Sequence, residues 1–237
     1  IGVAVVGLIT LLMLPGVVSA QTYEWTNAAG STLTESLGGV ATDTSGNVYA
    51  GGYYRDTVDF DPGVGVDNIT AVGSDDVYLT KYNSGGAYQW TLSIGGSSTD
   101  RAIALNVDGD NIYVGGSFQG TVDFNPNGVA ENRTATANTD VFVAKYDSSG
   151  LLLWVNTFGG SGYEYASSID FDNTGNVIVV GTFYGTVDFD PSAGTDNYSS
   201  NGAFEDDVFV TKYTSSGSYV WTETFGGSAD DRGTGVA

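Results

Sequence analysis

The stretch DVFVAKY, Asp140–Tyr146, decides the fold because close copies of it recur along the chain. DVYLTKY occupies Asp76–Tyr82, and DVFVTKY occupies Asp207–Tyr213. A second string, TVDF, keeps the same step and begins at Thr57, Thr121 and Thr186. Successive copies of TVDF start 64 and then 65 residues apart. Self-similarity at a fixed period is the signature of a repeat architecture, so the repeat is the unit from which the fold is built.

Each repeat reads as four short strands joined by tight turns. In the second repeat the strands are expected over Ala102–Val107, Asn111–Phe118, Val141–Tyr146 and Leu151–Phe158. Gly, Asn, Asp and Ser stand in the turns, where short hairpins need positive φ angles or local side-chain hydrogen bonds. The third strand is apolar on both faces, so other sheets must cover both of its faces.

These features predict an all-β fold of β-propeller blades, which are four-stranded antiparallel units of about 64 residues packed face to face around an axis. The 35 glycines and 13% aromatic residues agree, because glycine suits turns and aromatic residues suit sheets. A β-solenoid would have shorter coils, and separate sandwich domains would be larger.

Both ends of the repeat region match parts of a repeat. Tyr23–Thr26 resembles the fourth-strand segment Tyr88–Thr91, although it precedes the first complete repeat. Such a strand is what closing a ring by strand exchange requires. Asp231–Ala237 aligns with Asp100–Asn106, the start of a first strand. We therefore expect residues 21–237 to hold three complete repeats and a partial fourth, an incomplete ring that continues beyond Ala237, since propellers have about four to eight blades.

The first twenty residues resemble a secretion signal. Ile1–Leu14 are uncharged and almost wholly apolar, Pro15 and Gly16 break the run, and small residues precede Gln21. This pattern predicts a signal peptide over residues 1–20, cut after Ala20 and missing its own N-terminal part. A membrane anchor is the alternative. The signal interpretation predicts a secreted or cell-surface protein with no membrane insertion after cleavage.

The charge and residue types exclude several classes of function. Seven Lys and Arg stand against 28 Asp and Glu, which gives a formal net charge of -21. Phosphate backbones and anionic lipids would be repelled, so nucleic acid is excluded as a partner. The chain has no Cys and no His, which removes disulfides, zinc sites built on these residues and Ser-His-Asp triads.

Three motifs resemble the bacterial SBBP-type β-propeller repeat. They are GNVYAGG at Gly46–Gly52, DVFVAKY at Asp140–Tyr146 and GGSADD at Gly226–Asp231. The resemblance implies a secreted or cell-surface bacterial propeller with no shared reaction or catalytic residues. The sequence departs from that pattern in a long insert between the second and third strands, Thr57–Ser74 in the first repeat.

The inserts contain paired acidic or amide residues that could hold calcium. The pairs are Asp59 and Asp61, Asp123 and Asn125, and Asp188 and Asp190. Oxygen ligands in a glycine-rich loop suit Ca²⁺, which takes about six to eight of them. The alternative is ordinary turn chemistry, in which Asp or Asn bonds the backbone two residues on. No cofactor other than this calcium is predicted.

An acid opens the first strand of every copy, at Glu35, Asp100, Glu164 and Asp231. Innermost strands line the channel of a propeller, so these acids could form a ring at one mouth that attracts a cationic ligand. Solvated loop charges, or partners of a nearby base, are the alternative. Three lysines also share one repeat position, and we expect each to form a structural ion pair with an acid. They are Lys81, Lys145 and Lys212.

Aromatic residues and glycosylation sequons also recur in phase. The tryptophans and one further aromatic series could stack on sugars, but core packing between blades is the favoured interpretation. These residues are Trp25, Trp90, Trp154, Trp221, Tyr54, Phe118 and Phe183. The sequons begin at Asn68, Asn132 and Asn197, and they become candidate glycan sites in a eukaryotic source.

The sequence favours a non-catalytic binding scaffold whose loops at one end of the ring take a protein or glycan. The near-identity of the repeats argues against an enzyme, because a catalytic site needs one repeat to differ from the others. A hydrolase or lyase with its active site on further blades is the first alternative. A structural spacer in a large surface protein is the second.

Overall fold

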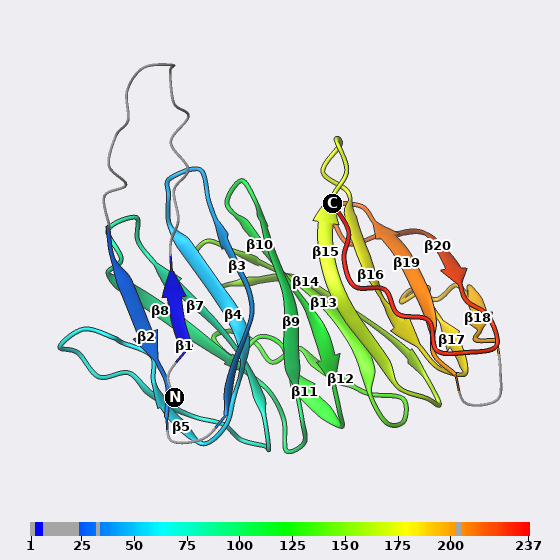
Figure 1. Ribbon diagram of the computed structural model, residues 1–237, viewed down its shortest axis with the longest axis horizontal. Helices are drawn as coiled ribbons and strands as arrows, with labels where there is room; N and C mark the ends of the chain where they lie inside the picture. Colours follow the sequence, from blue (N-terminus) through cyan, green and yellow to red (C-terminus); the bar gives the residue numbers. More distant parts are fainter. Residues whose placement is uncertain (1–2, 7–23, 32–33, 202–204) are drawn as a thin grey trace.

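The computed structural model describes residues 3–6, 24–31, 34–201 and 205–237, and in these residues the chain forms strands without any helix. The described part therefore contains no helix that is long and apolar enough to cross a membrane. Most of these strands group into three larger antiparallel sheets that follow one another along the molecule, with two-stranded pairs beside them (Figure 1). The predicted all-β class is confirmed.

Each repeat forms one four-stranded sheet in which neighbours in the sequence are neighbours in space. The first sheet consists of β3 (Glu35–Thr42), β4 (Val48–Tyr54), β7 (Asp76–Tyr82) and β8 (Tyr88–Ile94). The second consists of β9 (Arg101–Asp108), β10 (Asn111–Phe118), β13 (Asp140–Asp147) and β14 (Leu152–Gly160). The third consists of β15 (Glu164–Phe171), β16 (Val177–Phe183), β19 (Asp207–Tyr213) and β20 (Tyr219–Phe225). The strands predicted for the second repeat match to within two residues.

Each long insert contains a hairpin of two short strands, although the sequence predicted loops there. They pair β5 (Thr57–Asp59) with β6 (Asn68–Thr70), β11 (Thr121–Asp123) with β12 (Asn132–Thr134), and β17 (Thr186–Asp188) with β18 (Asn197–Ser199). The TVDF string explains them, because its Val and Phe are buried while its Thr is exposed, the alternation of a half-buried strand. β17 also pairs with Gly159 and Gly160 of β14, so a hairpin can extend the sheet of the preceding repeat.

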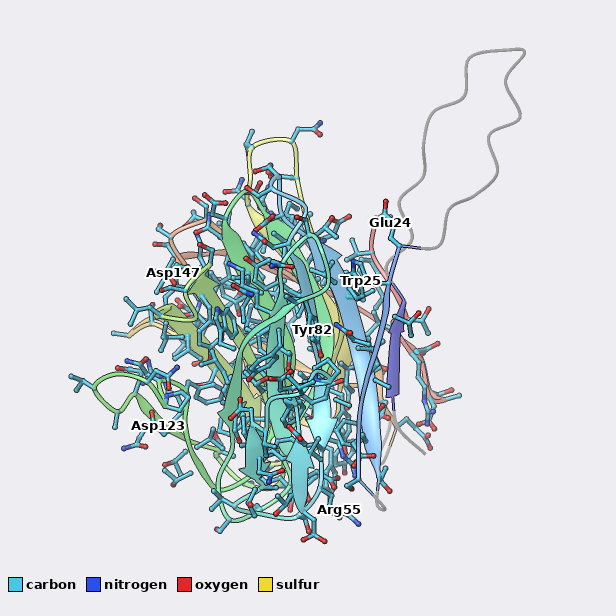
Figure 2. The ribbon with its side chains drawn as sticks, turned by 90° about the vertical axis from the view of Figure 1, so that its left-hand side faces the viewer. Glu24, Trp25, Arg55, Tyr82, Asp123 and Asp147 are labelled. Carbon is cyan, nitrogen blue, oxygen red and sulfur yellow. The ribbon has the colours of Figure 1, made fainter. Side chains whose placement is uncertain are left out.

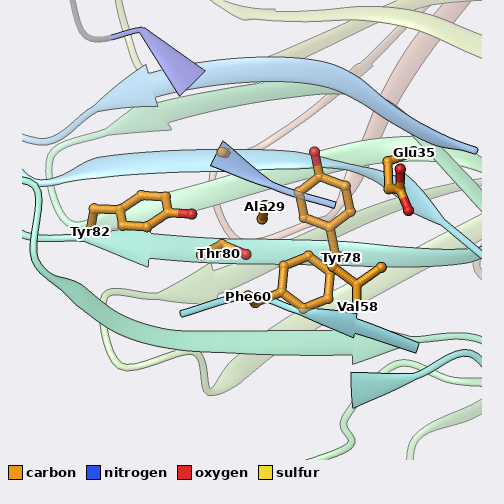
Figure 3. A pocket seen from close by; sticks show the side chains of 8 residues that line it. Ala29, Glu35, Val58, Phe60, Tyr78, Thr80 and Tyr82 are labelled. Atoms are coloured by element: carbon orange, nitrogen blue, oxygen red, sulfur yellow. The ribbon is translucent and has the colours of Figure 1, made fainter. Parts of the chain in front are cut away.

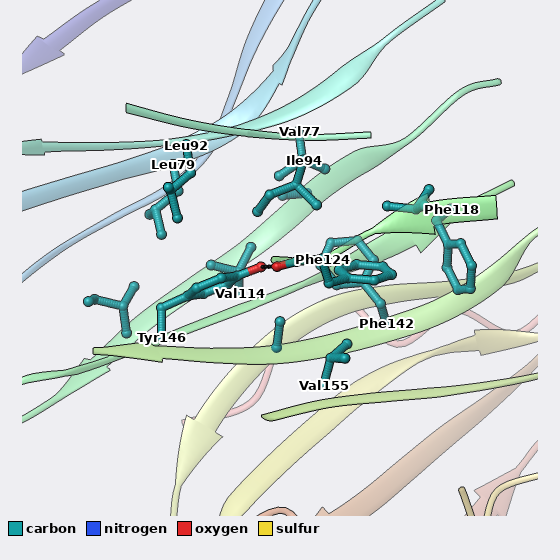
Figure 4. Close-up of a cluster of buried hydrophobic side chains, with 14 of the residues drawn as sticks. Val77, Leu79, Leu92, Ile94, Val114, Phe118, Phe124, Phe142, Tyr146 and Val155 are labelled. Carbon is teal, nitrogen blue, oxygen red and sulfur yellow. Dashed lines mark hydrogen bonds between the residues drawn. The ribbon is translucent and has the colours of Figure 1, made fainter. Parts of the chain in front are cut away.

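The core lies between the sheets and not within any one of them. Val77, Leu79 and Ile94 of the first sheet pack with Phe142 and Tyr146 of the second in one cluster (Figure 4). β13 shows the arrangement most clearly. Its Val141 and Val143 belong to the cluster shared with the third sheet, while Phe142, Ala144 and Tyr146 belong to the cluster shared with the first. The prediction that the third strand is covered on two sides is confirmed for β7 and β13, while one face of β19 is only partly buried.

A tryptophan of a fourth strand and lysines of third strands bond the turn of the next sheet. Trp154 Nε1 donates to the Ser215 carbonyl at 3.2 Å, and its ring lies so close to Gly217 that a Cβ there would clash. Gly217 also has φ 87°, which favours glycine. Lys81 Nζ donates to the Ser148 carbonyl at 2.8 Å, and Lys145 Nζ to the Ser215 carbonyl at 3.0 Å.

The ion-pair prediction is therefore wrong for Lys81 and Lys145, whose ammonium groups bond backbone carbonyls of the next sheet. A carbonyl of a fixed turn serves as well as a carboxylate here, because an ammonium group needs only acceptors. The prediction holds for Lys212, which lies 2.6 Å from Asp172 Oδ2.

β2 (Thr26–Ala29) repeats this joint at the start of the repeat region. Trp25 Nε1 donates to the Ser84 carbonyl at 3.3 Å, and its ring centroid lies 6.1 Å from that of Tyr82 (Figure 2). Asn27 Nδ2 donates to the Gly86 carbonyl at 2.7 Å, as Asn156 Nδ2 does to the Gly217 carbonyl. β2 thus occupies the place of a fourth strand in front of the first sheet.

Two further segments sit where strands of additional sheets would lie. β1 (Val3–Val6) pairs with β2 so that Val5 faces Asn27, the same register in which Val143 faces Asn156. At the other end, the Asp231 N–H donates to the Asp206 carbonyl at 2.7 Å, as Asp100 does to Asp75. Residues 1–2 and 7–20 of the predicted signal peptide lie outside the described residues, and the signal peptide stays a prediction.

Replacing Phe142 with Ala should lower the free energy of unfolding by about 3–5 kcal/mol, because it removes a buried ring from the core between two sheets. The Phe142 ring centroid lies 5.1 Å from that of Phe124. Urea unfolding followed by circular dichroism measures the effect. Leu153→Ala on the exposed face of β14 is the control and should change stability by about 0.5 kcal/mol or less. Equal effects of the two variants would contradict the shared core.

Candidate functional site

The glycine pair at the end of each fourth strand lies beside a carboxylate from the next sheet. Asp100 Oδ2 accepts the Gly96 N–H at 2.8 Å, Glu164 Oε2 accepts the Gly160 N–H at 3.2 Å, and Asp231 Oδ2 accepts the Gly227 N–H at 2.8 Å. At the corresponding position of the first sheet, Glu35 Oε1 accepts the Ser31 N–H at 2.9 Å. Backbone N–H groups therefore satisfy one oxygen of each predicted ring acid. Their binding of a cationic ligand stays a prediction.

A second carboxylate, which the sequence analysis did not single out, faces each glycine pair from the other side. Asp76, Asp140 and Asp207 open the third strands, and each accepts a backbone N–H from the preceding loop. A Cβ on Gly159 would collide with the Asp140 carboxylate, which explains the glycine. The signal available in the sequence was an acid that opens an otherwise apolar strand in all three repeats.

Burial and facing carboxylates raise the pKa values of Asp100 and Glu164. Burial raises the pKa of Asp100 to about 6, and the charge of Asp76 adds to the effect. Burial raises the pKa of Glu164 to about 8, and the charges of Asp140 and Asp206 add to it. Glu164 is 0% exposed, and its Oε1 has no hydrogen-bond partner among the described residues. With this pKa, Glu164 is mostly protonated at pH 7, so it contributes little negative charge to this end of the sheets.

A cluster of Arg and Asp side chains reinforces the junction between the first two sheets. The buried Asp75 carboxylate lies 2.6 Å from Arg55 Nη2 and 2.5 Å from Arg101 Nη2. The guanidinium of Arg101 also lies 4.8 Å from the centre of the Tyr53 ring. At the next junction Thr139 replaces Asp75 and accepts from Gln119 Nε2 at 3.0 Å. The repeats therefore differ in how this end of each junction is paired.

The hairpins and the Gly-Gly loops gather at one end of the sheets, which we call the loop end. β4 and β8 are both antiparallel to β7, so the hairpin after β4 and the loop after β8 leave the sheet at the same end. Arg55 lies at the loop end, and Asp147, in the turn between β13 and β14, lies toward the opposite end (Figure 2). Tyr163 and Tyr165 are exposed large side chains near this end of the third sheet.

The predicted calcium ligands make turn hydrogen bonds in every repeat. Asp59 Oδ1 accepts the N–H groups of Asp61 and Asp67, at 3.1 and 2.8 Å. Asp123 and Asp188 make the same pair of bonds in their own hairpins, to Asn125 and Glu131 and to Asp190 and Asp196. Within the described ranges no three acidic side chains are grouped for a metal ion. Calcium binding stays a prediction.

A small hollow lies between Ala29 of β2, Val58 and Phe60 of the first hairpin, and Tyr78 of β7, with Glu35 at one side (Figure 3). Its volume of about 10 Å³ is room for about one water molecule. The corresponding position at the next two junctions holds the larger Ile94 and Phe158. The Phe158 ring fills that space, with its centroid 5.2 Å from that of Phe189.

The remaining motifs divide between core and surface. Trp25, Trp90 and Trp154 contact the hydrophobic clusters, and Tyr54, Phe118 and Phe183 are fully buried, in keeping with the core interpretation. Trp221 is 37% exposed. The sequon residues Asn68, Asn132 and Asn197 are exposed at the starts of β6, β12 and β18.

Three stacked sheets of one repeated design define an all-β repeat scaffold. No model of a known protein family matches the chain. An uncharacterized WD repeat-containing protein of Acanthamoeba polyphaga mimivirus is 29% identical in an alignment 214 residues long that covers 79% of this chain and 15% of that protein. The regulatory protein FlaEY of Caulobacter vibrioides is 29% identical in an alignment 164 residues long that covers 67% of this chain and 16% of FlaEY.

The chain spans about a sixth of the length of these curated relatives. The similarity to a WD repeat-containing protein agrees with the structure, because both indicate a β protein built from repeats. The repeat here is longer than the about 40–45 residues of a WD repeat. The SBBP-type resemblance stays a prediction.

Raising the pH should destabilise the protein through Glu164. Its folded pKa of about 8 exceeds the ordinary 4.5, so the folded state holds a proton that the unfolded state has lost. The free energy of unfolding should therefore fall as the pH rises from 4.5 to about 8. Glu164→Gln should reduce this slope, as measured by melting temperature against pH. Asp110→Asn, which removes an exposed charge, should leave the slope nearly unchanged, and an equal reduction by both variants would contradict the assignment.

Overfilling the hollow under β2 should destabilise the protein. Ala29→Ile adds three carbon atoms where there is room for about one water molecule, so the free energy of unfolding should fall by about 1–3 kcal/mol. Ala28→Ile on the exposed side of β2 is the control and should change stability by about 0.5 kcal/mol or less. Urea unfolding measures both variants. Equal effects of the two variants would mean that β2 does not sit over the first sheet in this way.

Proposed function

We propose that this chain is part of a secreted or cell-surface β-propeller that acts as a non-catalytic scaffold and binds a protein or glycan at its loop end. The observation that carries the proposal is the shared core. Neighbouring described sheets bury the faces that they share, β2 stands in front of the first sheet in the place of a fourth strand, and Asp231 bonds the third sheet as Asp100 bonds the first. Four-stranded sheets that pack in this way close into propellers.

The uncovered face of the third sheet favours a closed ring of sheets over an open stack that ends here. Phe225 of β20 is 58% exposed, whereas its counterpart Phe158 in β14 is 4% exposed under the third sheet. Terminal repeats of open solenoids instead carry polar outer faces. We infer that a further sheet of the same repeat covers β20, and that β2 serves as the fourth strand of the last blade.

The loop end supports ligand binding because it differs from repeat to repeat. Rigid scaffolds commonly bind through loops, which vary without disturbing the core. At this end Arg101 and Tyr53 stack at the first junction, while Tyr163 and Tyr165 are exposed at the second. Both carboxylate oxygens of Asp100 accept backbone N–H groups, which favours a binding surface over a catalytic one at this loop.

The architecture and the secretion are tested on the natural full-length protein, expressed in its own host. Electron microscopy should show a closed ring, and N-terminal sequencing of the exported protein should begin at Gln21. An extended rod, or a mature protein that retains residues 1–20, would overturn this part of the proposal.

Ligand binding at the loop end is tested on an array of oligosaccharides and extracellular proteins. The double variant Tyr163→Ala/Tyr165→Ala should lose at least tenfold in affinity for the ligand bound there. Val64→Ala on the exposed tip of a hairpin is the control and should bind as the natural protein does. Unchanged binding in the double variant would place the ligand elsewhere.

A further inference from the structure

A polar groove opens on the outer rim, where the second and third sheets meet. It lies between β14, the tip of the β17–β18 hairpin and the turn that joins β19 to β20. Its volume is about 400 Å³, within the range of about 300–1,000 Å³ typical of small-molecule sites. The side chains that matter for its chemistry are Asn156, Asp190, Ser192, Ser216, Ser218 and Tyr219.

The polar groups of the groove are held in fixed positions. Asn156 Nδ2 donates to the Gly217 carbonyl at 2.7 Å, which orients its amide. Asp190 Oδ1 accepts the Ser192 N–H at 2.9 Å. The Tyr219 hydroxyl donates to Asp196, which fixes the ring at the edge of the groove. Donors and acceptors preorganised in this way bind a ligand at a lower entropic cost.

The joint between two sheets does not require these polar residues. At the junction of the first and second sheets, Leu92 replaces Asn156, and Leu151 and Leu152 replace Ser218 and Tyr219. Leu92 is 2% exposed and lies beside Gly150, where an added Cβ would reach ordinary van der Waals contact with it. The same backbone joint thus forms with leucines, so packing alone does not explain the polar set.

The polar set occurs a second time, which sets it apart from chance variation. At the joint between β2 and the first sheet, Asn27 bonds the Gly86 carbonyl, and the Tyr88 hydroxyl donates to Asp67. These contacts match those of Asn156 and Tyr219. Two of the three described joints therefore carry an oriented amide and a tyrosine, and the joint between them carries leucines.

We infer that the groove at Asn156 and Tyr219 binds a neutral or amino sugar unit of a saccharide. Amide, carboxylate and hydroxyl groups can pair with sugar hydroxyls, and the Tyr219 ring and Pro191 offer apolar surface to a sugar face. Asp190 and the net charge of -21 disfavour uronic acids and sulfated sugars. The rim groove is separate from the loop end, so this site does not depend on the proposed function.

The test uses the whole chain on an array of neutral, amino and uronic-acid oligosaccharides, with oligolysine as the peptide probe. The natural chain should bind at least one neutral or amino sugar. Asn156→Leu/Tyr219→Leu copies residues of the first junction and should weaken that binding at least tenfold, with a melting temperature that shows the variant to be folded. Leu153→Ala on the exposed face of β14 is the control and should leave the binding unchanged. Sugar binding that is lost in Tyr163→Ala/Tyr165→Ala but kept in Asn156→Leu/Tyr219→Leu would place the sugar at the loop end and overturn this proposal.

A second variant adds a binding site, so its effect cannot be explained by unfolding. Leu92→Asn/Leu152→Tyr should create the polar set at the first junction and raise the number of sugar molecules bound per chain by one, as measured by titration calorimetry. Binding of oligolysine in place of any sugar would overturn the proposal. Absence of sugar binding, or equal binding by the natural chain and the Asn156→Leu/Tyr219→Leu variant, would overturn it as well.

Discussion

The burial of each inner sheet face against the next sheet is the constraint on which the rest of the structure depends. β13 divides its side chains between two clusters, with Val143 on one side and Phe142 on the other. A strand that is apolar on both faces cannot be stable in a sheet with one face in water. The repeats must therefore stack, and the stacking in turn fixes where the tryptophans, lysines and glycine pairs lie.

This constraint also explains which parts of the surface can differ between repeats and so can carry function. Apolar packing holds the middle of each strand, so variation concentrates at the loop end and on the outer rim. The first junction uses Arg55, Asp75 and Arg101 at the loop end and leucines on the rim. The second uses Gln119 and Thr139 at the loop end and Asn156 with Tyr219 on the rim. One backbone design thus presents chemically different surfaces at successive joints.

The sequence alone predicted the features that follow from the repeat period. The four strands of each sheet, the two covered faces of the third strand and the unusual strand at Trp25 all follow from the spacing and alternation of apolar residues. The hairpins were missed because a three-residue strand such as Thr57–Asp59 carries too short a pattern next to the turn signals around Pro62. Of the facing carboxylates, Glu164 was predicted as a site residue and Asp140 was missed. A sequence shows that an acid recurs, but not which side of a glycine pair it approaches. The rim groove depends on contacts between different repeats, which spacing within one repeat cannot reveal.

Hydrogen exchange of the native chain tests the shared core most directly, because β13 and β19 have nearly the same sequence and differ in their neighbours. β13 is buried on both faces, whereas Val208 and Val210 of β19 are only partly buried. If stability comes from packing between sheets, the amides of β13 should exchange much more slowly than those of β19, since local opening of β13 breaks contacts on two sides. Equal protection of the two strands would mean that each sheet is stable by itself, and would contradict the account.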